Sequence, residues 1–285
     1  MIQLSVIIVN YNSKFYLKSC LESVNDASRN LNVEIIVIDN DSSDGSYEFI
    51  ILDFPQITWI QNSENLGFSK ANNIAFKKSS GKYILFINPD VIVSQTALEE
   101  LYVFSQNQQN LGAIGVRMTD EHGNYRLESK RNIPNPSNTF SKLFSYLKFF
   151  SKNIQSKGYY NVSISEYEIG KIEILTGAFF WVSGKVYEEA GGFDESYFMY
   201  GEDIDLSYTI LRLGYQNYYY GKSTVVHYKG KSTVKNKQYY QRFFGAMKIF
   251  IKKYYSRPYY LYILLLTGLN VRYYLALTLD KLKKK

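Results

Sequence analysis

The stretch LSVIIVNYN, residues 4–12, decides the fold of this chain. It is a continuous apolar run that ends in polar side chains, as buried strands of parallel sheets do. Residues 14–24 follow with apolar positions at helical spacing, and VEIIVIDND at residues 33–41 repeats the strand pattern. Buried strands that alternate with helices predict an α/β fold with a mainly parallel sheet.

The same alternation continues along the chain. Residues 57–62 and 82–90 are predicted strands, and residues 68–78 between them are a predicted helix. In sheets of this kind the ligand lies at the carboxyl ends of the strands. We therefore expect the polar residues that follow these strands to gather on one rim: Asn10, Asp39, Asn62 to Gly67 and Asn88 to Asp90.

The second half of the chain adds three predicted segments. Residues 174–195 have the pattern of a strand, a turn and a short helix, and another helix is expected to begin near Glu202. Residues 220–233 are predicted as a last strand followed by a basic loop that contains Lys229 and Lys231. No internal repeat interrupts this organisation.

Composition limits the class of protein. The 285 residues and the 46% hydrophobic fraction suffice for one large α/β domain, or for one domain with an appendage. A single cysteine, Cys20, excludes an internal disulfide framework and a cysteine-based zinc site. The first strand lacks the basic start and small-residue cleavage site of a signal peptide, so we expect a chain that begins with the sheet itself.

Charge divides the chain into two parts. Residues 229–285 carry a net charge of +13, whereas residues 1–228 carry −6. We therefore predict an α/β domain over residues 1–234 and a basic, aromatic helical tail over residues 235–285. This division favours a tail that meets an anionic surface.

The apolar part of the tail, residues 258–271, is short for a membrane span. A spanning helix needs about 20 apolar residues, and Asn270 and Arg272 interrupt this one. The pattern favours interfacial helices that lie on an anionic membrane, with tyrosines at the boundary and basic side chains on lipid phosphates. The alternative is a helix docked on the domain with a solvated basic face. A nucleic-acid partner is not expected, because the basic charge lies in this apolar tail.

Four sites with acidic or histidine side chains are candidates for catalysis or for binding a ligand or metal. Asp39 ends a strand, where it could accept from a ribose hydroxyl or cap the next helix. Asp90, after the strand that ends at Asn88, suits a divalent cation or a simple turn. Three acids lie between Gly201 and Leu206, and one of them could be a general base or only complement a helix dipole. His227 could bind the same metal or be a buried structural histidine.

The candidate motifs occur in a fixed order, and this order is far more specific than any single motif. In order they are NYN at 10–12, IDNDSSDGS at 38–46, NSENLGFSKANN at 62–73, LFINPD at 85–90, TGAF at 176–179, GGFDE at 191–195, GEDIDL at 201–206 and His227. The chain thereby resembles the family-2 glycosyltransferases of GT-A fold, and most of all their rhamnosyltransferase-like branch. The resemblance covers residues 3–233. It implies a mixed, mainly parallel sheet flanked by helices, with a Rossmann-like nucleotide-binding half.

The resemblance also implies a role for each matching residue. Asp203 is the general base, with Glu202 beside it. Asp90 and His227 bind Mg²⁺ or Mn²⁺, although Asn88 stands where many relatives have an aspartate. Gly177 and Trp181 face the acceptor, unless Trp181 is simply a buried strand residue. The implied nucleotide-binding residues are Asn10, Asn12, Asp39, Asn65, Gly67 and Asn88.

The implied enzyme is an inverting glycosyltransferase. Its expected donor is a dTDP-sugar, with rhamnose first, or a UDP-hexose, and its expected acceptor is a lipid-linked glycan of the cell surface. The expected location is the cytoplasmic side of the bacterial inner membrane, as a peripheral protein. Two alternatives are a non-catalytic membrane partner with this fold and a sugar-nucleotide nucleotidylyltransferase. The latter would need a glycine-rich loop after the first strand, and this chain has no glycine before Gly45.

Overall fold

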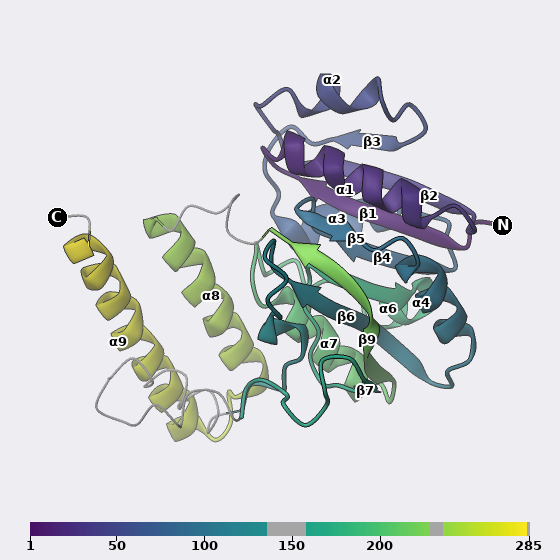
Figure 1. Ribbon diagram of the computed structural model, residues 1–285. Coiled ribbons are helices and arrows are strands. Elements are labelled where there is room, and N and C mark those ends of the chain that lie inside the picture. The colour runs from purple at the N-terminus through teal and green to yellow at the C-terminus, as the bar shows by residue number, and fades with distance from the viewer. Residues whose placement is uncertain (136–157, 229–235, 284–285) are drawn as a thin grey trace.

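The computed structural model describes residues 1–135, 158–228 and 236–283, which form an α/β body followed by two long helices (Figure 1). The strands are β1 (Leu4–Asn10), β2 (Val33–Asp39), β3 (Thr58–Gln61), β4 (Tyr83–Ile87), β5 (Val91–Val93), β6 (Leu111–Thr119), β7 (Ile169–Lys171), β8 (Phe179–Ser183) and β9 (Gln216–His227). The helices are α1 (Lys14–Ala27), α2 (Ser46–Ile51), α3 (Phe68–Phe76), α4 (Ala97–Gln106), the short 3₁₀ helix η1 (Leu127–Ser129), α6 (Gly184–Glu189), α7 (Glu202–Arg212), α8 (Lys237–Tyr254) and α9 (Tyr259–Lys283).

The strands form one mixed sheet, as the sequence predicted. Its order is β3-β2-β1-β4-β8-β6-β9-β5, with β7 paired to β9. The pairs among β1, β2, β3 and β4 are parallel, whereas β8 runs antiparallel to both β4 and β6. The half that the sequence predicts to bind a nucleotide is the parallel part of the sheet, and the antiparallel strands extend it.

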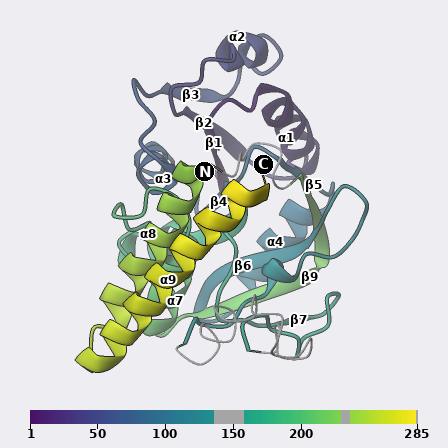
Figure 2. The same ribbon diagram turned by 90° about the vertical axis from the view of Figure 1, so that its left-hand side faces the viewer.

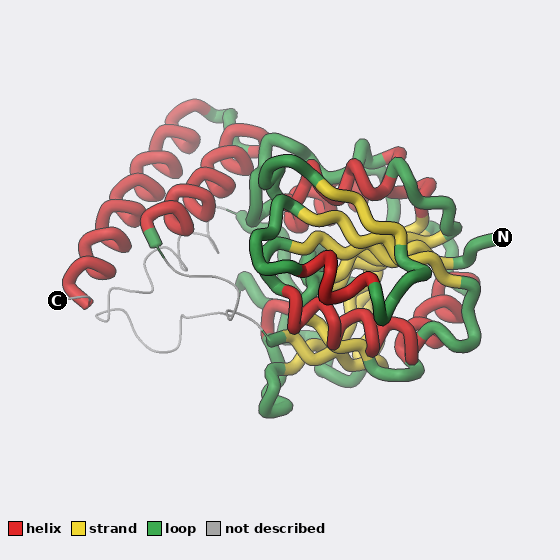
Figure 3. Tube along the Cα trace, turned by 90° about the horizontal axis from the view of Figure 1, so that it is seen from above, coloured by secondary structure: helices red, strands yellow, loops and turns green. Residues whose placement is uncertain are grey.

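Helices cover both faces of the sheet, as Figure 3 shows from above. Side chains alternate along each strand, so that Val6 and Ile8 of β1 pack with α1 and α4, whereas Ile7 packs with α3, α6 and α7. Both faces are apolar, which is why the strands read as continuous apolar runs. The two layers of helices leave only the strand ends open.

The site edge lies where the strand order reverses. From β1 the chain proceeds to β2 and β3 on one side and then returns to place β4 on the other side of β1. Such a switch point opens a crevice at the carboxyl ends of the strands. Asn10 and Asp39 are in register there, at the ends of β1 and β2, and Asn88 follows β4.

The tail folds into a hairpin of two helices that lie side by side (Figure 2). Phe244 and Ile251 of α8 pack on Leu265 and Leu269 of α9 in a small apolar core. The helix α9 is longer than expected, because it continues unbroken through Asn270 and Arg272. Its segment Tyr259–Asp280 has the length and composition to cross a membrane, so the apolar part of the tail is not too short for a span.

Ion pairs of the partly exposed Lys253 attach α8 to the body. The Nζ atom of Lys253 donates to Asp205 Oδ2 at 2.9 Å and to Asp194 Oδ2 at 2.7 Å. The hydroxyl of Tyr254 donates to Asp205 Oδ1 at 2.7 Å. The Asp205 side chain is only 4% exposed, so this acid of the GEDIDL motif serves to hold α8 against α7. The expected boundary between residues 234 and 235 lies outside the described residues.

Candidate active site

The loops after β1 and β2 are joined by a network of side chains. Asn10 Nδ2 donates to Asp39 Oδ2 at 2.6 Å and to Ser42 Oγ at 3.1 Å. The other Asp39 oxygen accepts from the Ser42 amide and from Gln61 Nε2. Asp39 is 1% exposed, so its buried carboxylate holds the rim loops in position through these hydrogen bonds. Its proposed contact with a nucleoside stays a prediction.

Asn12 fixes the same rim from the opposite loop. It adopts a left-handed backbone with φ of 52°, a conformation that asparagine tolerates better than most residues. Its side-chain oxygen accepts from the Ser43 amide, and its own amide donates to Ser42 Oγ at 2.8 Å. Neither Asn10, Asn12 nor Asp39 lines the large cavity described below. These three residues therefore support the rim around that cavity.

Asn65 and Gly67 bring a distant loop to the cavity. The Gly67 amide donates to Asn65 Oδ1, and Gly67 has a φ of +83°. A Cβ atom there would lie 2.4 Å from the carbonyl oxygen of Phe198. Glycine is thus required for two reasons, backbone conformation and close approach. The contact places the loop that precedes α7 directly over the start of α3.

Asp90 and His227 meet through strand pairing. His227 ends β9 opposite Val91 of β5, which puts the imidazole beside the Asp90 carboxylate. Asp90 Oδ1 lies 3.3 Å from His227 Nε2, and the two side chains are 7% and 8% exposed. Among the described residues, neither Asp90 Oδ1 nor His227 Nδ1 has a hydrogen-bond partner. Buried polar atoms without partners are rare in native proteins.

This pair fits a divalent cation. Two ligands at about 2.1 Å from one ion and at right angles to each other lie about 3 Å apart, close to the observed separation. Among the described residues no group of three His, Cys, Asp or Glu side chains gathers. Mg²⁺ and Mn²⁺ commonly take their other ligands from phosphate and water. The backbone of Asn88 accepts from the Val91 amide, and its side chain lines the cavity nearby.

The acid pair begins α7, as expected from the sequence. Asp203 Oδ2 accepts from Arg131 Nη2 at 2.6 Å and from the Gly177 amide at 3.0 Å. Arg131 also donates to the Leu175 carbonyl. Burial lowers the pKa of Arg131, but the Asp203 carboxylate more than offsets this and leaves that pKa raised. Sequence reasoning missed Arg131, which lies in a loop with no readable periodicity.

Glu202 has a different environment from its neighbour. Its carboxyl group is buried, and Oε2 has no hydrogen-bond partner among the described residues. Burial raises the pKa of Glu202 well above its usual range, and the Asp203 charge raises it further. The pair thus consists of one carboxylate matched by arginine and one carboxyl group that favours the protonated form.

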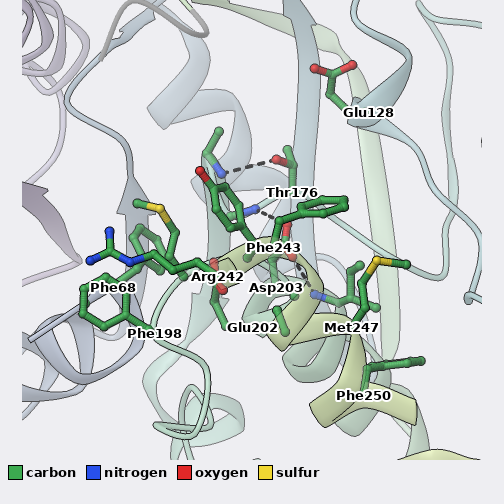
Figure 4. A pocket seen from close by; sticks show the side chains of 18 of the residues that line it. Phe68, Glu128, Thr176, Phe198, Glu202, Asp203, Arg242, Phe243, Met247 and Phe250 are labelled. Carbon is green, nitrogen blue, oxygen red and sulfur yellow. Dashed lines mark hydrogen bonds between the residues drawn. The ribbon is translucent and has the colours of Figure 1, made fainter. Parts of the chain in front are cut away.

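A cavity of about 550 Å³ joins these groups (Figure 4). Figure 4 shows Glu202 and Asp203 together with side chains of α8 and with Arg242 near Phe198. The predicted site residues that line it are Asn65, Gly67, Asn88, Asp90, Gly177, Glu202, Asp203 and His227. The predicted basic loop with Lys229 and Lys231 lies outside the described residues.

Trp181 does not belong to this cavity, which corrects its expected place in an acceptor wall. It is fully buried in β8 and stacks on Tyr83 with 5.6 Å between ring centroids. A side chain with no exposed surface has no face to offer an acceptor. Gly177, by contrast, lines the cavity, and a Cβ atom there would lie 3.3 Å from Asp203 Cβ.

Comparisons with known proteins place these features in a family. A family model described as "Glycosyl transferase family 2" matches residues 5–165. The N-acetylglucosaminyl-diphospho-decaprenol L-rhamnosyltransferase of Mycobacterium tuberculosis is 27% identical over 244 residues, which are 81% of this chain and 77% of the relative. The rhamnosyltransferase WbbL of Escherichia coli is 26% identical over 230 residues, 78% of this chain and 82% of the relative.

Solved structures confirm the GT-A-like fold. A mannosyltransferase from Pyrobaculum calidifontis, in complex with GDP-Man and Mn²⁺, aligns with a TM-score of 0.59 at 16% identity. The alignment covers 88% of this chain and 64% of that one. GalNAc-T7 with UDP, GalNAc and Mn²⁺ gives the same TM-score at 17% identity, over 88% of this chain and 48% of that structure.

Proposed function

This chain belongs to glycosyl transferase family 2 and is a glycosyltransferase, and from this premise we propose that it is an inverting enzyme of cell-surface glycan synthesis. The proposed donor is a nucleoside-diphosphate sugar, dTDP-rhamnose first and a UDP-hexose second. The proposed acceptor is a hydroxyl of a lipid-linked glycan. The family match favours this reading over a nucleotidylyltransferase or a non-catalytic partner.

One observation carries the proposal. Asp90, His227 and the Glu202–Asp203 pair come from three separate stretches of the chain, yet they line the same cavity. A transfer reaction needs a place for the leaving diphosphate and a base for the acceptor hydroxyl, both within reach of one sugar. The metal pair and the acid pair supply these two functions.

The donor would bind along the rim at the ends of the parallel strands. Asn65, Gly67 and Asn88 would contact the nucleotide where they line the cavity, over a rim held in shape by Asn10, Asn12 and Asp39. Asp90 and His227 would hold Mg²⁺ or Mn²⁺. When bound, the cation would neutralise negative charge that develops on the leaving diphosphate.

Asp203 is the proposed general base. It would accept the proton of the acceptor hydroxyl, whose oxygen attacks the anomeric carbon from the face opposite the diphosphate and thereby inverts its configuration. Arg131 and the Gly177 amide keep this carboxylate in one orientation, which reduces the cost of alignment in the transition state. Glu202 lies beside it, and burial together with the Asp203 charge raises the pKa of its carboxyl group.

The tail supports a membrane location. We propose that the α8–α9 hairpin binds the cytoplasmic face of the inner membrane as a peripheral anchor. Its basic residues would contact lipid phosphates, and the exposed Tyr259, Tyr260 and Leu264 of α9 would enter the interface. The M. tuberculosis relative is named for a diphospho-decaprenol acceptor, which is consistent with a lipid-linked acceptor here. Resistance to extraction from membranes at high salt and alkaline pH would instead favour a spanning α9.

Donor turnover tests the proposal directly. Purified protein is incubated with dTDP- and UDP-sugars, with and without Mn²⁺, and released nucleoside diphosphate is measured. We expect release from one donor that depends on the cation and falls by about 100-fold or more in Asp90→Ala. Asp26→Ala, an exposed aspartate on α1, is the matched control and should keep wild-type activity.

The opposite result has a defined meaning. Folded protein that neither binds nor cleaves any donor, even with a lipid-linked acceptor present, would overturn the proposed transferase activity. Turnover that is equal with chelator and with Mn²⁺ would leave the transferase in place but contradict the metal assignment of Asp90 and His227.

A further inference from the structure

Part of the cavity wall beside the acid pair comes from α8, a helix of the tail. A Cβ atom on Gly201, which directly precedes Glu202, would lie 3.5 Å from the Cβ atom of Ala246 in α8. Phe243 lies one turn before Ala246 on the same face of that helix, and both residues line the cavity. Figure 4 shows Phe243 on the helix that passes Asp203 and Glu202. The tail therefore contributes directly to the candidate active site.

The contact between α8 and the loop before α7 is made by aromatic rings. The ring centroid of Phe243 lies 6.1 Å from that of Tyr239, with only 10° between the ring planes. The ring of Tyr200 lies 6.0 Å from Phe243 and 5.6 Å from Tyr239 between centroids. All three side chains are half-buried and line the cavity. We call these three residues the aromatic cluster, and part of its surface remains open to the cavity.

The backbone of Tyr200 is a second, independent sign that this cluster has a function. Tyr200 has a φ of 73°, in the left-handed region that a bulky side chain rarely adopts. Residues in such conformations persist only where their surroundings hold them, and they gather at functional sites. The strained residue lies two positions before Glu202, at the point where the loop presents a ring to α8.

Glu202 adds a polar group next to the aromatic cluster. Its side chain lines the cavity and is 6% exposed, and its Oε2 atom has no hydrogen-bond partner among the described residues. A buried polar atom without a partner in the protein is available to a polar group of a ligand. Aromatic surface with a few well-placed polar groups is the usual composition of a small-molecule site.

Charge does not identify the ligand of this wall. Side chains of both signs line the cavity in addition to the acid pair and Asp90: Glu128, Arg131, Arg242 and Arg272. Arg131 is paired with Asp203, and Glu128 and Arg272 each interact with another group. The ligand is indicated instead by the aromatic surface, because the negative face of an aromatic ring attracts C–H groups. A pyranose ring offers such a C–H face together with hydroxyls, and it carries no net charge.

The acceptor of the proposed reaction must bring a hydroxyl to Asp203. The part of the acceptor that lies nearest the base is then the sugar ring that carries this hydroxyl. This inference rests on the proposed function. We propose that the aromatic cluster is the subsite for the acceptor pyranose. The C–H face of the sugar packs on Phe243, and Glu202 forms a hydrogen bond with a second hydroxyl of the same sugar.

Binding of simple glycosides tests the subsite without knowledge of the whole acceptor. Methyl glycosides of N-acetylglucosamine, glucose, galactose and rhamnose carry no lipid, and each is titrated into the full-length protein in detergent with UDP and Mn²⁺. Saturation-transfer NMR reports which ligand protons contact the protein. We expect at least one glycoside to bind, with the strongest saturation at its ring C–H groups.

Two substitutions of Phe243 separate an aromatic contact from a merely apolar one. Phe243→Leu keeps an apolar side chain but removes the ring, and it should weaken glycoside binding by about fivefold. Phe243→Tyr keeps the ring and should bind with nearly wild-type affinity. Glu202→Leu removes the polar group and should also weaken binding by about fivefold, the effect of one hydrogen bond. Unchanged binding in Glu202→Leu would remove Glu202 from the subsite.

The matched control is Tyr274→Leu, which removes an exposed ring of α9 that does not line the cavity. It should bind the glycosides as the wild type does. Equal affinities of Phe243→Leu and the wild type would overturn the proposal, and so would the absence of binding by every glycoside. Farnesol that displaces the glycosides and binds Phe243→Leu as tightly as the wild type would assign this wall to a lipid chain instead.

These outcomes are separable from failure of the proposed function. Glycoside binding that depends on Phe243, in protein that neither binds nor cleaves any donor, would remove the transferase activity and keep the subsite. Donor turnover together with glycoside binding that is independent of Phe243 would do the reverse. Thermal unfolding of each variant confirms that it is folded under the conditions of the titration.

Discussion

The rim at the ends of β1 and β2 and the wall formed by α7, α8 and Arg131 belong to one site but are held together by different forces. Along the rim, Asn10 bonds to Asp39, and Asn10, Asn12 and Asp39 each form a hydrogen bond with Ser42. The wall depends on buried ion pairs, chiefly Arg131 with Asp203. The wall is therefore the part of the site that a charge change disrupts.

The difference has a cause in the topology. Rim residues lie on neighbouring parallel strands whose register already brings Asn10 opposite Asp39. Wall residues come from a loop, a helix start and the tail, so no ladder of hydrogen bonds positions them. Ion pairs between separate elements hold the wall residues in position instead. Three changes test how far this contrast holds, the first by its effect on turnover and the other two by their effects on stability.

The largest effect is expected for Asp203→Asn. This change keeps the size of the side chain but removes the proposed base, so kcat should fall by about 10²- to 10⁴-fold. Single-turnover rates with saturating donor measure the loss. Full activity in Asp203→Asn would show that another group accepts the proton, and would reduce Asp203 to a structural partner of Arg131.

An intermediate effect is expected for Lys253→Met. It leaves the buried Asp205 without its cation, while Lys253 itself is 39% exposed and loses less. Loss of a partner from a fully buried pair costs about 3–5 kcal/mol, and solvent screening reduces this to about 1–2 kcal/mol here. Urea unfolding measures the change. Lys252→Met, the exposed neighbour on α8, should change the free energy of unfolding by less than about 0.5 kcal/mol.

The third effect concerns the pH dependence of stability. Because the pKa of Glu202 is raised in the folded state, its contribution is complete below the ordinary glutamate pKa of about 4.3 and is lost as the pH rises toward the folded-state value. Each pKa unit corresponds to about 1.4 kcal/mol. Glu202→Gln should remove this decline in the free energy of unfolding between acidic and neutral pH. Glu64→Gln, an exposed site, should keep the wild-type slope.

If the slope in Glu202→Gln equals that of the wild type, Glu202 ionises normally and the wall carries two negative charges. The rim differs from the wall in charge, because its hydrogen-bond network consists mostly of neutral donors around the single carboxylate of Asp39.

The sequence predicted the parts of the site that follow strands and begin helices. Apolar runs that end at Asn10, Asp39 and Asn88 located the rim, and the acid cluster located the start of α7 at Glu202. The resemblance also assigned Asp90 and His227 to one metal site, and the pairing of β5 with β9 places the two side chains next to each other. The acceptor role that the resemblance implied for Trp181 was wrong, and the alternative of a buried strand residue was correct, because both faces of the sheet are covered at this position.

What the sequence by itself determined is the α/β fold, the family and the residues at strand ends, since periodicity and local motifs act over short stretches of chain. Only the tertiary structure decided that Arg131 pairs with Asp203, that Lys253 attaches α8 to Asp205, and that Arg242 lines the cavity. These pairings join residues separated by dozens of positions. Their geometry depends on how whole helices pack, and packing energies are not encoded in any one segment.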